Sequence, residues 1–193
     1  GGAVRPPPGL ILAAGESRAM GGGAKPLLLL GRRALISRII DRTEPQAGPM
    51  AINTNAADKG YQALGLPLLP DVVADRPGPL AGILTAMDWA IATGHTHVAT
   101  VPGDTPFLPG DLIPQLLLCS ETADAVPVLA ASGGRVHPVA GLWPAMLRDR
   151  LATALAAGPR RMTDWAEKVG SVIVDFPATT PAPLFKANTH EEP

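Results

Sequence analysis

The chain has 193 residues, of which 46% are hydrophobic and 17% charged, and its formal net charge is −1. This length and apolar content suit one globular domain with a sizeable core, and the lack of a basic cluster argues against nucleic acid as a partner, because phosphate backbones are bound by clustered Lys and Arg. Cys119 is the only cysteine, which excludes a disulfide within the chain, and no apolar run approaches the roughly 20 residues of a membrane span. We therefore expect a cytoplasmic protein without a membrane partner, in which residues 1–8 form a flexible lead and residues 9–193 a single domain.

Short apolar segments, typical of buried strands, alternate along the chain with longer segments of helical periodicity. In chain order the expected elements are a strand at 9–14, a helix at 35–43, a strand at 49–53, a helix at 56–64, a strand at 66–69, a helix at 80–93, a strand at 96–102, a helix at 111–120, strands at 125–130 and 135–142, helices at 144–157 and 161–169, and a strand at 172–176. Ser132-Gly133-Gly134 predicts a hairpin-like turn between two of these strands. The alternation indicates an α/β fold: a doubly wound, mostly parallel, Rossmann-like sheet with an antiparallel strand and helices on both faces.

The segment 10–26, LILAAGESRAMGGGAKP, is an apolar strand followed by a glycine-rich loop that ends on Lys25. Glycines let backbone N–H groups approach a phosphate, and a lysine supplies a mobile positive charge. Two standard phosphate loops are excluded, because Pro26 rather than Ser or Thr follows Lys25 and no G-x-G-x-x-G follows the strand. We predict a nucleotide site of another kind, in which Lys25 neutralises a triphosphate and Arg18 is a further candidate contact.

Polar residues follow several of the expected strands at the points where those strands end. Asp104 is one of them, and Asn53 and Asp71 are the others. In open α/β sheets, ligands bind beyond the carboxyl ends of the strands. Asp104 suits Mg²⁺, which needs few protein ligands when phosphates supply the rest, whereas Asn53 and Asp71 can hydrogen-bond a base or ribose and are also frequent turn residues. Gly78-Pro-Leu-Ala-Gly82 begins the clearest helix, whose N-terminus can face an anion or a flat ligand.

Together these motifs resemble those of the molybdenum cofactor guanylyltransferases, the enzymes that attach GMP to molybdopterin. The resemblance covers nearly the whole chain after Pro8, and the combination is specific although each piece alone is weak. It implies the nucleotidyltransferase form of the Rossmann-like sheet. The matching motifs are Leu12-Ala-Ala-Gly15 with Arg18 and Lys25, Asn53, Asp71-Val72, Gly78-Pro-Leu-Ala-Gly82, Asp104-Thr-Pro-Phe-Leu-Pro109, His137-Pro138 with Gly141-Leu-Trp143, and Phe185 with Asn188-Thr-His-Glu-Glu192.

The resemblance implies transfer of GMP from GTP to the terminal phosphate of molybdenum-bound molybdopterin, with release of pyrophosphate. GTP and molybdenum-molybdopterin are then the substrates, Mg²⁺ is the cofactor, and proteins of the molybdenum cofactor pathway are candidate partners. Lys25 and Asp104 are implied as catalytic residues, and Asp104 also as the metal ligand. The implied nucleotide-binding residues are Leu12, Ala13, Ala14, Gly15, Lys25, Asn53, Asp71 and Asp104, and the further candidate contacts are Arg18, Gly78, Pro79, Leu80, Gly82 and Asn188.

Ala14 leaves the choice of base open. It stands where guanylyltransferases usually have a glycine, and Leu-Ala-Ala-Gly is closer to the sister cytidylyltransferases that act on the same pterin. The extra methyl can crowd a purine and shift the preference by about 1–3 kcal/mol, although Gly78–Gly82 is guanylyl-like. A CTP-dependent molybdopterin cytidylyltransferase is therefore the first alternative. The others are a nucleotide- or cofactor-binding protein without turnover and a sugar-phosphate nucleotidyltransferase, a group that also has a glycine-rich loop ending in lysine.

Overall fold

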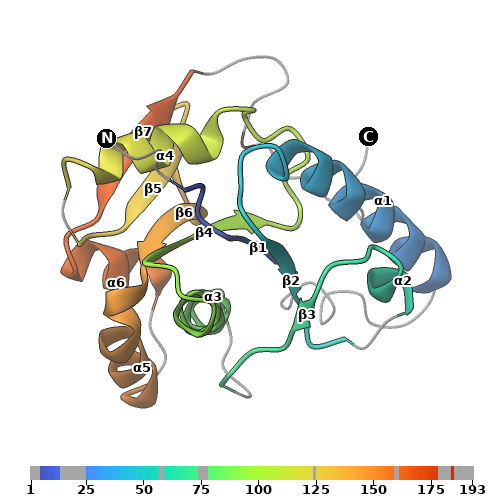
Figure 1. Cartoon of the computed structure of the whole chain (residues 1–193), viewed down its shortest axis with the longest axis horizontal. Helices are drawn as coiled ribbons and strands as arrows, with labels where there is room; N and C mark the ends of the chain where they lie inside the picture. The colour runs from blue at the N-terminus through green and yellow to red at the C-terminus, as the bar shows by residue number, and fades with distance from the viewer. Residues whose placement is uncertain are drawn as a thin grey trace.

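The computed structural model of the protein describes residues 5–13, 25–56, 59–73, 78–123, 125–158, 161–177 and 184. Its centre is a seven-stranded sheet with the strand order β3-β2-β1-β4-β6-β5-β7 (Figure 1). The strands are β1 (Gly9–Leu12), β2 (Met50–Asn53), β3 (Leu68–Leu69), β4 (His97–Pro102), β5 (Val128–Ser132), β6 (Arg135–Pro144) and β7 (Val172–Phe176). Every pair is parallel except those of β6, which is antiparallel to both β4 and β5. The predicted mostly parallel sheet with an antiparallel strand is confirmed.

Helices cover both faces of the sheet, as predicted (Figure 1). Side chains of α3, α5, α6 and the 3-10 turn η1 form a core on one face, and side chains of α1, α2 and α4 form a second core on the other. The helices are α1 (Lys25–Thr43), α2 (Lys59–Gln62), α3 (Leu80–Ala92), α4 (Leu112–Ser120), η1 (Ala145–Leu147), α5 (Arg148–Ala156) and α6 (Met162–Lys168). Within the described ranges, no helix combines the length and the apolar character needed to cross a lipid bilayer.

The central strands are apolar at consecutive positions because both of their faces are buried. Leu10 packs into the core beneath α3, whereas the next residue, Ile11, packs into the core beneath α1 and α4. Val98 and Ala99 on β4 divide in the same way, and none of these four side chains is exposed to solvent. Successive side chains of a strand point to opposite faces, so a sheet covered twice requires unbroken apolar runs.

Gly133 and Gly134 close the hairpin between β5 and β6, with φ angles of 60° and 74°. Positive φ at both central residues matches the right-handed twist of paired strands, and glycine adopts it without strain. The predicted turn is confirmed, and it directs β6 back between β5 and β4. Pro144, the last residue of β6, consequently lies opposite His97, so α5 begins near the amino end of β4.

The structure corrects the predicted extent of the first helix. α1 begins at Lys25, well before the predicted start at residue 35, so Lys25 is the first residue of a helix rather than the last of a loop. The leucine run 27–30 hides the helical period, and Pro26 is tolerated because the first turn of a helix needs no N–H donors. α2 is shorter than the helix predicted at 56–64, and the remaining boundaries differ by a few residues.

Candidate nucleotide site

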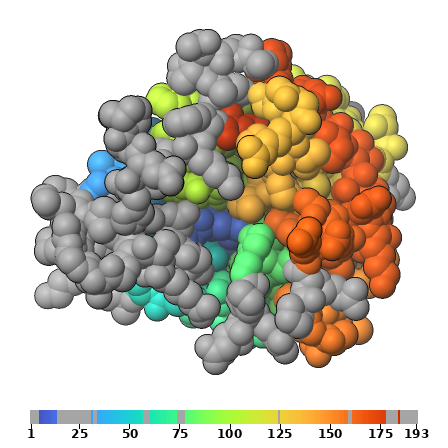
Figure 2. Space-filling model, turned by 180° about the vertical axis from the view of Figure 1, so that it is seen from behind, coloured from blue at the N-terminus to red at the C-terminus, as the bar shows by residue number. Residues whose placement is uncertain are grey.

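Four neighbouring strands end in one row. Leu12 on β1 lies opposite Asn53 on one side and Pro102 on the other, and Asn53 lies opposite Leu69 on β3. The residues that follow these strands therefore emerge at the same edge of the sheet. In Figure 2 the blue atoms of the β1 segment lie in a hollow beside the green atoms of the segment that begins α3. The edge that the sequence predicts as the binding edge thus gathers Leu12, Asn53, Asp71 and Asp104, all candidate site residues.

Asn53 and Asn55 hold the carboxylate of Asp71. The Nδ2 of Asn53 donates to the carbonyl oxygen of Leu69 and to Oδ1 of Asp71, at 3.0 Å each. The Nδ2 of Asn55 donates to the other oxygen, Oδ2, at 3.2 Å, and the backbone N–H of Asp71 donates to Oδ1 of Asn55 at 2.9 Å. Each carboxylate oxygen of Asp71 therefore accepts one amide N–H.

Sequence reasoning missed Asn55. The available signal was its spacing of two residues from Asn53, because side chains two apart along an extended chain point to the same side. Asn53 is only 1% exposed, whereas Asn55 is exposed and looks in the sequence like any polar residue of a turn. Only the strand order of the folded chain brings Asp71 against both amides.

The first turn of α3 lies directly against the ends of β1 and β2. A Cβ atom at Gly82 would lie 2.8 Å from Oδ1 of Asn53 and 3.1 Å from a methyl of Leu12, so only glycine fits at this approach. Gly78, just before the helix, has a φ of +89°, which favours glycine for a second reason. Pro79 is the N-cap residue, and the side chain of Leu80 is buried in the core.

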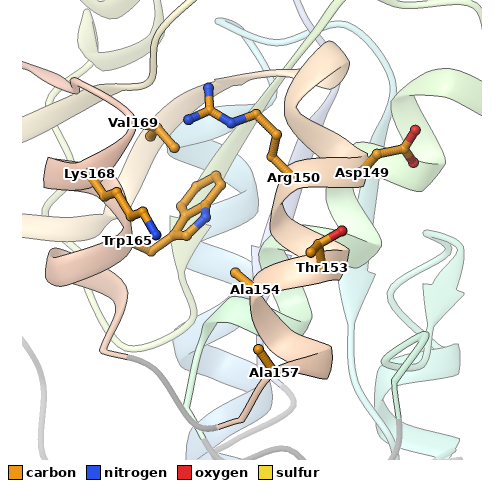
Figure 3. Close-up of a pocket in the computed structure, with 8 residues that line it drawn as sticks. All are labelled: Asp149, Arg150, Thr153, Ala154, Ala157, Trp165, Lys168 and Val169. Atoms are coloured by element: carbon orange, nitrogen blue, oxygen red, sulfur yellow. The ribbon is translucent and has the colours of Figure 1, made fainter.

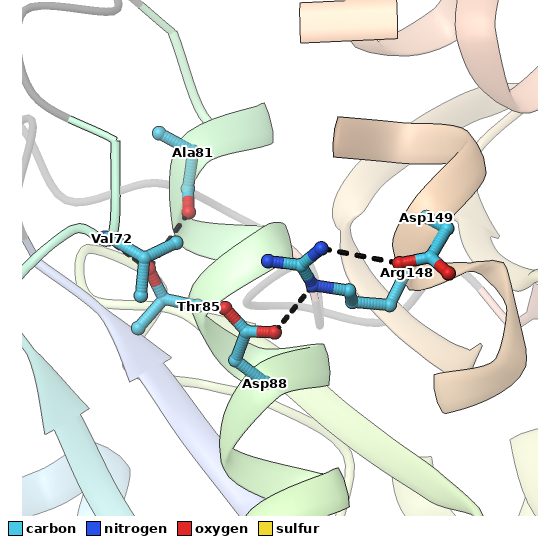
Figure 4. Close-up of polar contacts among 6 residues, drawn as sticks. All are labelled: Val72, Ala81, Thr85, Asp88, Arg148 and Asp149. Atoms are coloured by element: carbon cyan, nitrogen blue, oxygen red, sulfur yellow. Dashed lines mark hydrogen bonds and ion pairs between the residues drawn. The ribbon is translucent and has the colours of Figure 1, made fainter. Parts of the chain in front are cut away.

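Thr85 ties the segment after β3 to α3 (Figure 4). Its hydroxyl accepts the backbone N–H of Val72 at 3.0 Å and donates to the carbonyl oxygen of Ala81 at 2.9 Å. Thr85 is buried, and its bond to Ala81 is shielded from water. The position of Asp71, one residue before Val72, is thereby coupled to the helix that begins with Gly78–Gly82.

Asp104 occupies the other side of this edge, after β4. The N–H of the preceding Gly103 donates to the carbonyl oxygen of Leu12 at 3.0 Å, and a Cβ at Gly103 would lie 2.9 Å from that oxygen. The hydroxyl of Thr105 donates to Oδ1 of Asp104 at 3.2 Å. Asp104 is half-buried, and Oδ2 has no hydrogen-bond partner in the part of the chain that the structure describes.

This carboxylate fits a hard divalent cation. Mg²⁺ binds through one or two carboxylates and takes its remaining ligands from phosphates and water. Across the described ranges, no three His, Cys, Asp or Glu side chains form a cluster able to hold a metal by themselves. Asp104 would supply one such carboxylate.

The two acidic residues bracket the edge. Asp71 follows β3 and Asp104 follows β4, with β2 and β1 between them. Neighbouring strands lie about 4.8 Å apart, so three steps separate the two strands by about 14 Å. An extended ligand lying across the strand ends can therefore meet both carboxylates, one near each of its ends.

The remaining site predictions divide by what the structure describes. The backbone N–H of Ala13 donates to the carbonyl oxygen of Asn53 at 2.8 Å, which joins β1 to β2 just past their ends. Lys25 begins α1, and its side chain lies outside the described part of the structure. Ala14, Gly15, Arg18 and Asn188 also lie outside the described residues. The assignment of all these residues to the nucleotide site stays a prediction.

A separate groove of about 400 Å³ lies between α5 and α6 (Figure 3). The indole of Trp165 lies between the two helices, with Arg150 and Lys168 among the lining residues. The start of α5 is joined to α3 by Arg148, whose Nε donates to Asp88 at 2.6 Å (Figure 4). Because α5 begins near the amino end of β4, this groove does not belong to the edge that carries Asp71 and Asp104.

A seven-stranded, mostly parallel sheet with polar side chains gathered at its strand ends is the arrangement in which open α/β proteins bind their ligands. The chain belongs to the family of the MobA-like NTP transferase domain, whose model matches residues 9–171. The chain is 46% identical to a molybdenum cofactor guanylyltransferase of Cereibacter sphaeroides, over 88% of this chain and 85% of the relative. It is 40% identical to one of Bradyrhizobium, over 96% of this chain and 89% of the relative.

Solved structures agree on the fold. A protein of Aquifex aeolicus superposes with a TM-score of 0.78 at 20% identity, over 94% of this chain and 93% of that chain. The molybdopterin-guanine dinucleotide biosynthesis protein A of Archaeoglobus fulgidus superposes with a TM-score of 0.61 at 14% identity, over 87% of this chain and 83% of that chain. A CMP:2-keto-3-deoxy-manno-octonic acid synthetase complexed with CTP has a TM-score of 0.59 at 10% identity, over 94% of this chain and 93% of that chain. At these identities the likeness concerns the architecture alone.

Proposed function

We propose that this protein transfers GMP from GTP to the terminal phosphate of molybdenum-bound molybdopterin and releases pyrophosphate. The observation that carries the proposal is the gathering of Asn53, Asp71 and Asp104 at one sheet edge, in a chain of the MobA-like NTP transferase family. The relatives that are 37–46% identical and named molybdenum cofactor guanylyltransferase support the same substrates. Proteins of the molybdenum cofactor pathway are the corresponding candidate partners.

The reaction is an in-line substitution at the α-phosphorus of GTP. An oxygen of the pterin phosphate forms the new P–O bond, and the bond from the α-phosphorus to the β-phosphate oxygen breaks, so that pyrophosphate leaves. The attacking oxygen is already anionic, so the step needs no general base. Positioning and charge stabilisation are therefore the main contributions that the protein makes.

Asp104 would hold the metal, and Lys25 at the start of α1 would contact the triphosphate. Members of this family generally use a divalent metal. We infer Mg²⁺ from the half-buried carboxylate of Asp104, one oxygen of which has no partner among the described residues. When bound, Mg²⁺ stabilises negative charge on the transferring and leaving phosphates. Asp71 and Asn53 would lie at the nucleoside end: Asn53 ends β2 and Asp71 follows β3, so β1 separates both from Asp104.

The proposal is tested with purified protein, Mg²⁺ and molybdenum-molybdopterin, by measuring pyrophosphate and the dinucleotide product with each of GTP, CTP, ATP and UTP. We expect the most product with GTP. More product with CTP would instead identify a cytidylyltransferase, the alternative raised by Ala14. Nucleotide binding without pyrophosphate release, with molybdopterin or with sugar phosphates as acceptor, would identify a binding protein.

A further inference from the structure

We propose that Asn55 is a positioning residue for base selection. It holds the Asp71 carboxylate so that this group accepts hydrogen bonds from a nucleobase edge with two adjacent N–H donors, which guanine has and cytosine lacks. The inference rests on the proposed function in one respect, namely that Asp71 lies at the nucleoside end of the bound nucleotide. It concerns Asn55, a residue that the sequence analysis did not single out.

The contact between Asn55 and Asp71 is reciprocal. The amide Nδ2 donates to Oδ2 of the carboxylate at 3.2 Å, and the amide Oδ1 accepts the backbone N–H of Asp71 at 2.9 Å. One side chain thus restrains both the main chain of Asp71 and the rotation of its carboxylate. Among the described residues, removing Asn55 would leave the carboxylate bonded through Oδ1 alone, to Asn53 at 3.0 Å.

The partners of this pair are themselves anchored. Asn53 is 1% exposed, and its side chain bonds the carbonyl oxygen of Leu69. It also lies so close to Gly82 that a side chain at position 82 would collide with it. The N–H of Val72 bonds the buried hydroxyl of Thr85 on α3. Asp71 is therefore held from both sides before any ligand binds, and such pre-organisation lowers the entropic cost of binding.

The carboxylate keeps capacity for a ligand. A carboxylate has about four lone-pair sites, and the two amides of Asn53 and Asn55 use one on each oxygen. Asp71 is half-buried, so its carboxylate is reachable from the edge of the sheet. Two parallel N–H donors can bind both oxygens at once, as in bidentate recognition of carboxylates.

This acceptor pair discriminates between bases. Guanine presents N1–H and the N2 amino group side by side, whereas the Watson–Crick edge of cytosine presents its N4 amino group beside the acceptor N3. An acceptor facing a carboxylate oxygen gains no bond and is repelled, and sites built around hydrogen bonds reject such analogues strongly. Selection for guanine would then be achieved at Asp71, independently of the methyl group of Ala14.

The test is calorimetric titration of GTP and of CTP, each with Mg²⁺, into the wild type, Asn55→Ala, Asn55→Asp and Asp71→Asn. We expect Asn55→Ala to weaken GTP binding about tenfold, because a hydrogen bond to a charged group is lost, with little change for CTP. Asn55→Asp keeps an acceptor for the Asp71 N–H but opposes two carboxylates, so its GTP:CTP affinity ratio should fall further. Gln115→Ala is the matched control, since this amide also bonds a carboxylate, Asp111, at 3.4 Å on the exposed side of α4.

The outcomes separate the inference from the function on which it rests. If Asp71→Asn weakens GTP binding while both Asn55 variants keep the wild-type GTP:CTP ratio, the positioning role is overturned and the proposed function stands. If Asp71→Asn leaves GTP binding unchanged, Asp71 is not at the nucleotide and both the inference and that part of the proposed site are wrong. Thermal unfolding of each variant is recorded alongside, because a role in folding alone would lower stability without changing the ratio.

Discussion

At the scale of single residues, the two carboxylates of the site differ in what already binds them. Asp71 accepts an amide N–H on each oxygen, whereas Asp104 accepts only the Thr105 hydroxyl on Oδ1 within the described residues. A carboxylate held by two neutral donors is suited to recognising further donors, and a carboxylate with an open oxygen is suited to a cation. The different neighbours thus favour base recognition at one end of the edge and metal binding at the other.

The role of Asp104 leads to a prediction about turnover. Replacing Asp104 with Ala removes the proposed metal ligand, and we expect pyrophosphate release with GTP to fall by about 10²–10³-fold, the usual effect of losing one group that stabilises transition-state charge. The unfolding temperature should change little, because the side chain is half-exposed and forms one hydrogen bond among the described residues. Asp111→Ala, which removes an exposed carboxylate at the start of α4, is the control. Unchanged turnover would remove Asp104 from the metal site.

The partial burial of His97 leads to a prediction of how the free energy of unfolding depends on pH. It begins β4, and partial burial lowers the pKa of its imidazole below the ordinary value of 6.5. The unfolded chain therefore binds a proton more readily than the folded chain, so the free energy of unfolding should decrease as pH falls below about 6.5 and be fully retained above it. Urea unfolding at pH 5.5 and 7.5 measures the difference, which should shrink in His97→Gln. An equal pH dependence in that variant would contradict the prediction, and His95→Gln controls for loss of a neighbouring imidazole.

At the scale of elements, α3 connects the candidate nucleotide site with the rest of the fold. Its first turn touches β1 and β2 at Gly82, Thr85 bonds the segment after β3, and Asp88 bonds Arg148 at the start of α5. Of its thirteen residues, nine are buried, so the helix is packed along most of its length. A helix held by these contacts keeps its first turn in a fixed position beside the strand ends.

The close approach at Gly82 predicts opposite effects for the same substitution at two helical glycines. Gly82→Ala places a methyl 2.8 Å from Oδ1 of Asn53, so we expect it to lower the free energy of unfolding by about 1–3 kcal/mol, as overpacking does, and to weaken GTP binding. Gly31→Ala, in α1, meets no atom within 4 Å and should raise stability by about 0.5–1 kcal/mol. Urea unfolding of both variants, with GTP titration, makes the comparison. Equal effects at the two positions would show that the approach at Gly82 is looser than described.

At the scale of the whole molecule, a buried glutamine joins the segment after α1 to the start of α4. Gln46 follows α1 and is buried, and its Nε2 donates to the carbonyl oxygens of Arg42 and Pro109 at 2.8 and 2.9 Å. Its Oε1 accepts the backbone N–H of Ile113 in the first turn of α4, at 2.9 Å. Asp111, the N-cap residue of α4, makes no side-chain capping bond. The first turn of α4 is thus capped by a residue distant in the sequence.

Gln46→Ala should therefore destabilise the whole fold. Loss of the side chain leaves the buried N–H of Ile113 and the part-buried carbonyl of Pro109 without this partner, which costs about 1–3 kcal/mol in the free energy of unfolding. Urea denaturation measures this change. The slope of the unfolding free energy against urea concentration should stay the same if the fold is retained. Gln115→Ala on exposed α4 is the control and should change the free energy by less than about 0.5 kcal/mol. A similarly small effect of Gln46→Ala would show that water replaces its bonds.

Local sequence patterns are sufficient to predict some elements of this fold and not others. The hairpin at Gly133-Gly134 and the strand at 172–176 are read correctly, because turn chemistry and apolar runs are local properties. The start of α1 at Lys25 is missed, because four consecutive leucines show no period. Asn55 is missed because its partner, Asp71, is distant in the sequence. The predictions for Lys25, Ala14, Gly15, Arg18 and Asn188 concern side chains outside the described part of the chain.

The amino-acid sequence by itself determined the fold class and the edge at which Asn53, Asp71 and Asp104 gather, because apolar periodicity and the residues that end each strand are properties of short segments. Tertiary structure alone decided that β6 lies between β4 and β5, that Gly82 meets Asn53, and that Asn55 pairs with Asp71. These contacts depend on strand order and register, which arise when segments distant in the sequence bury their faces together, and no local pattern encodes them.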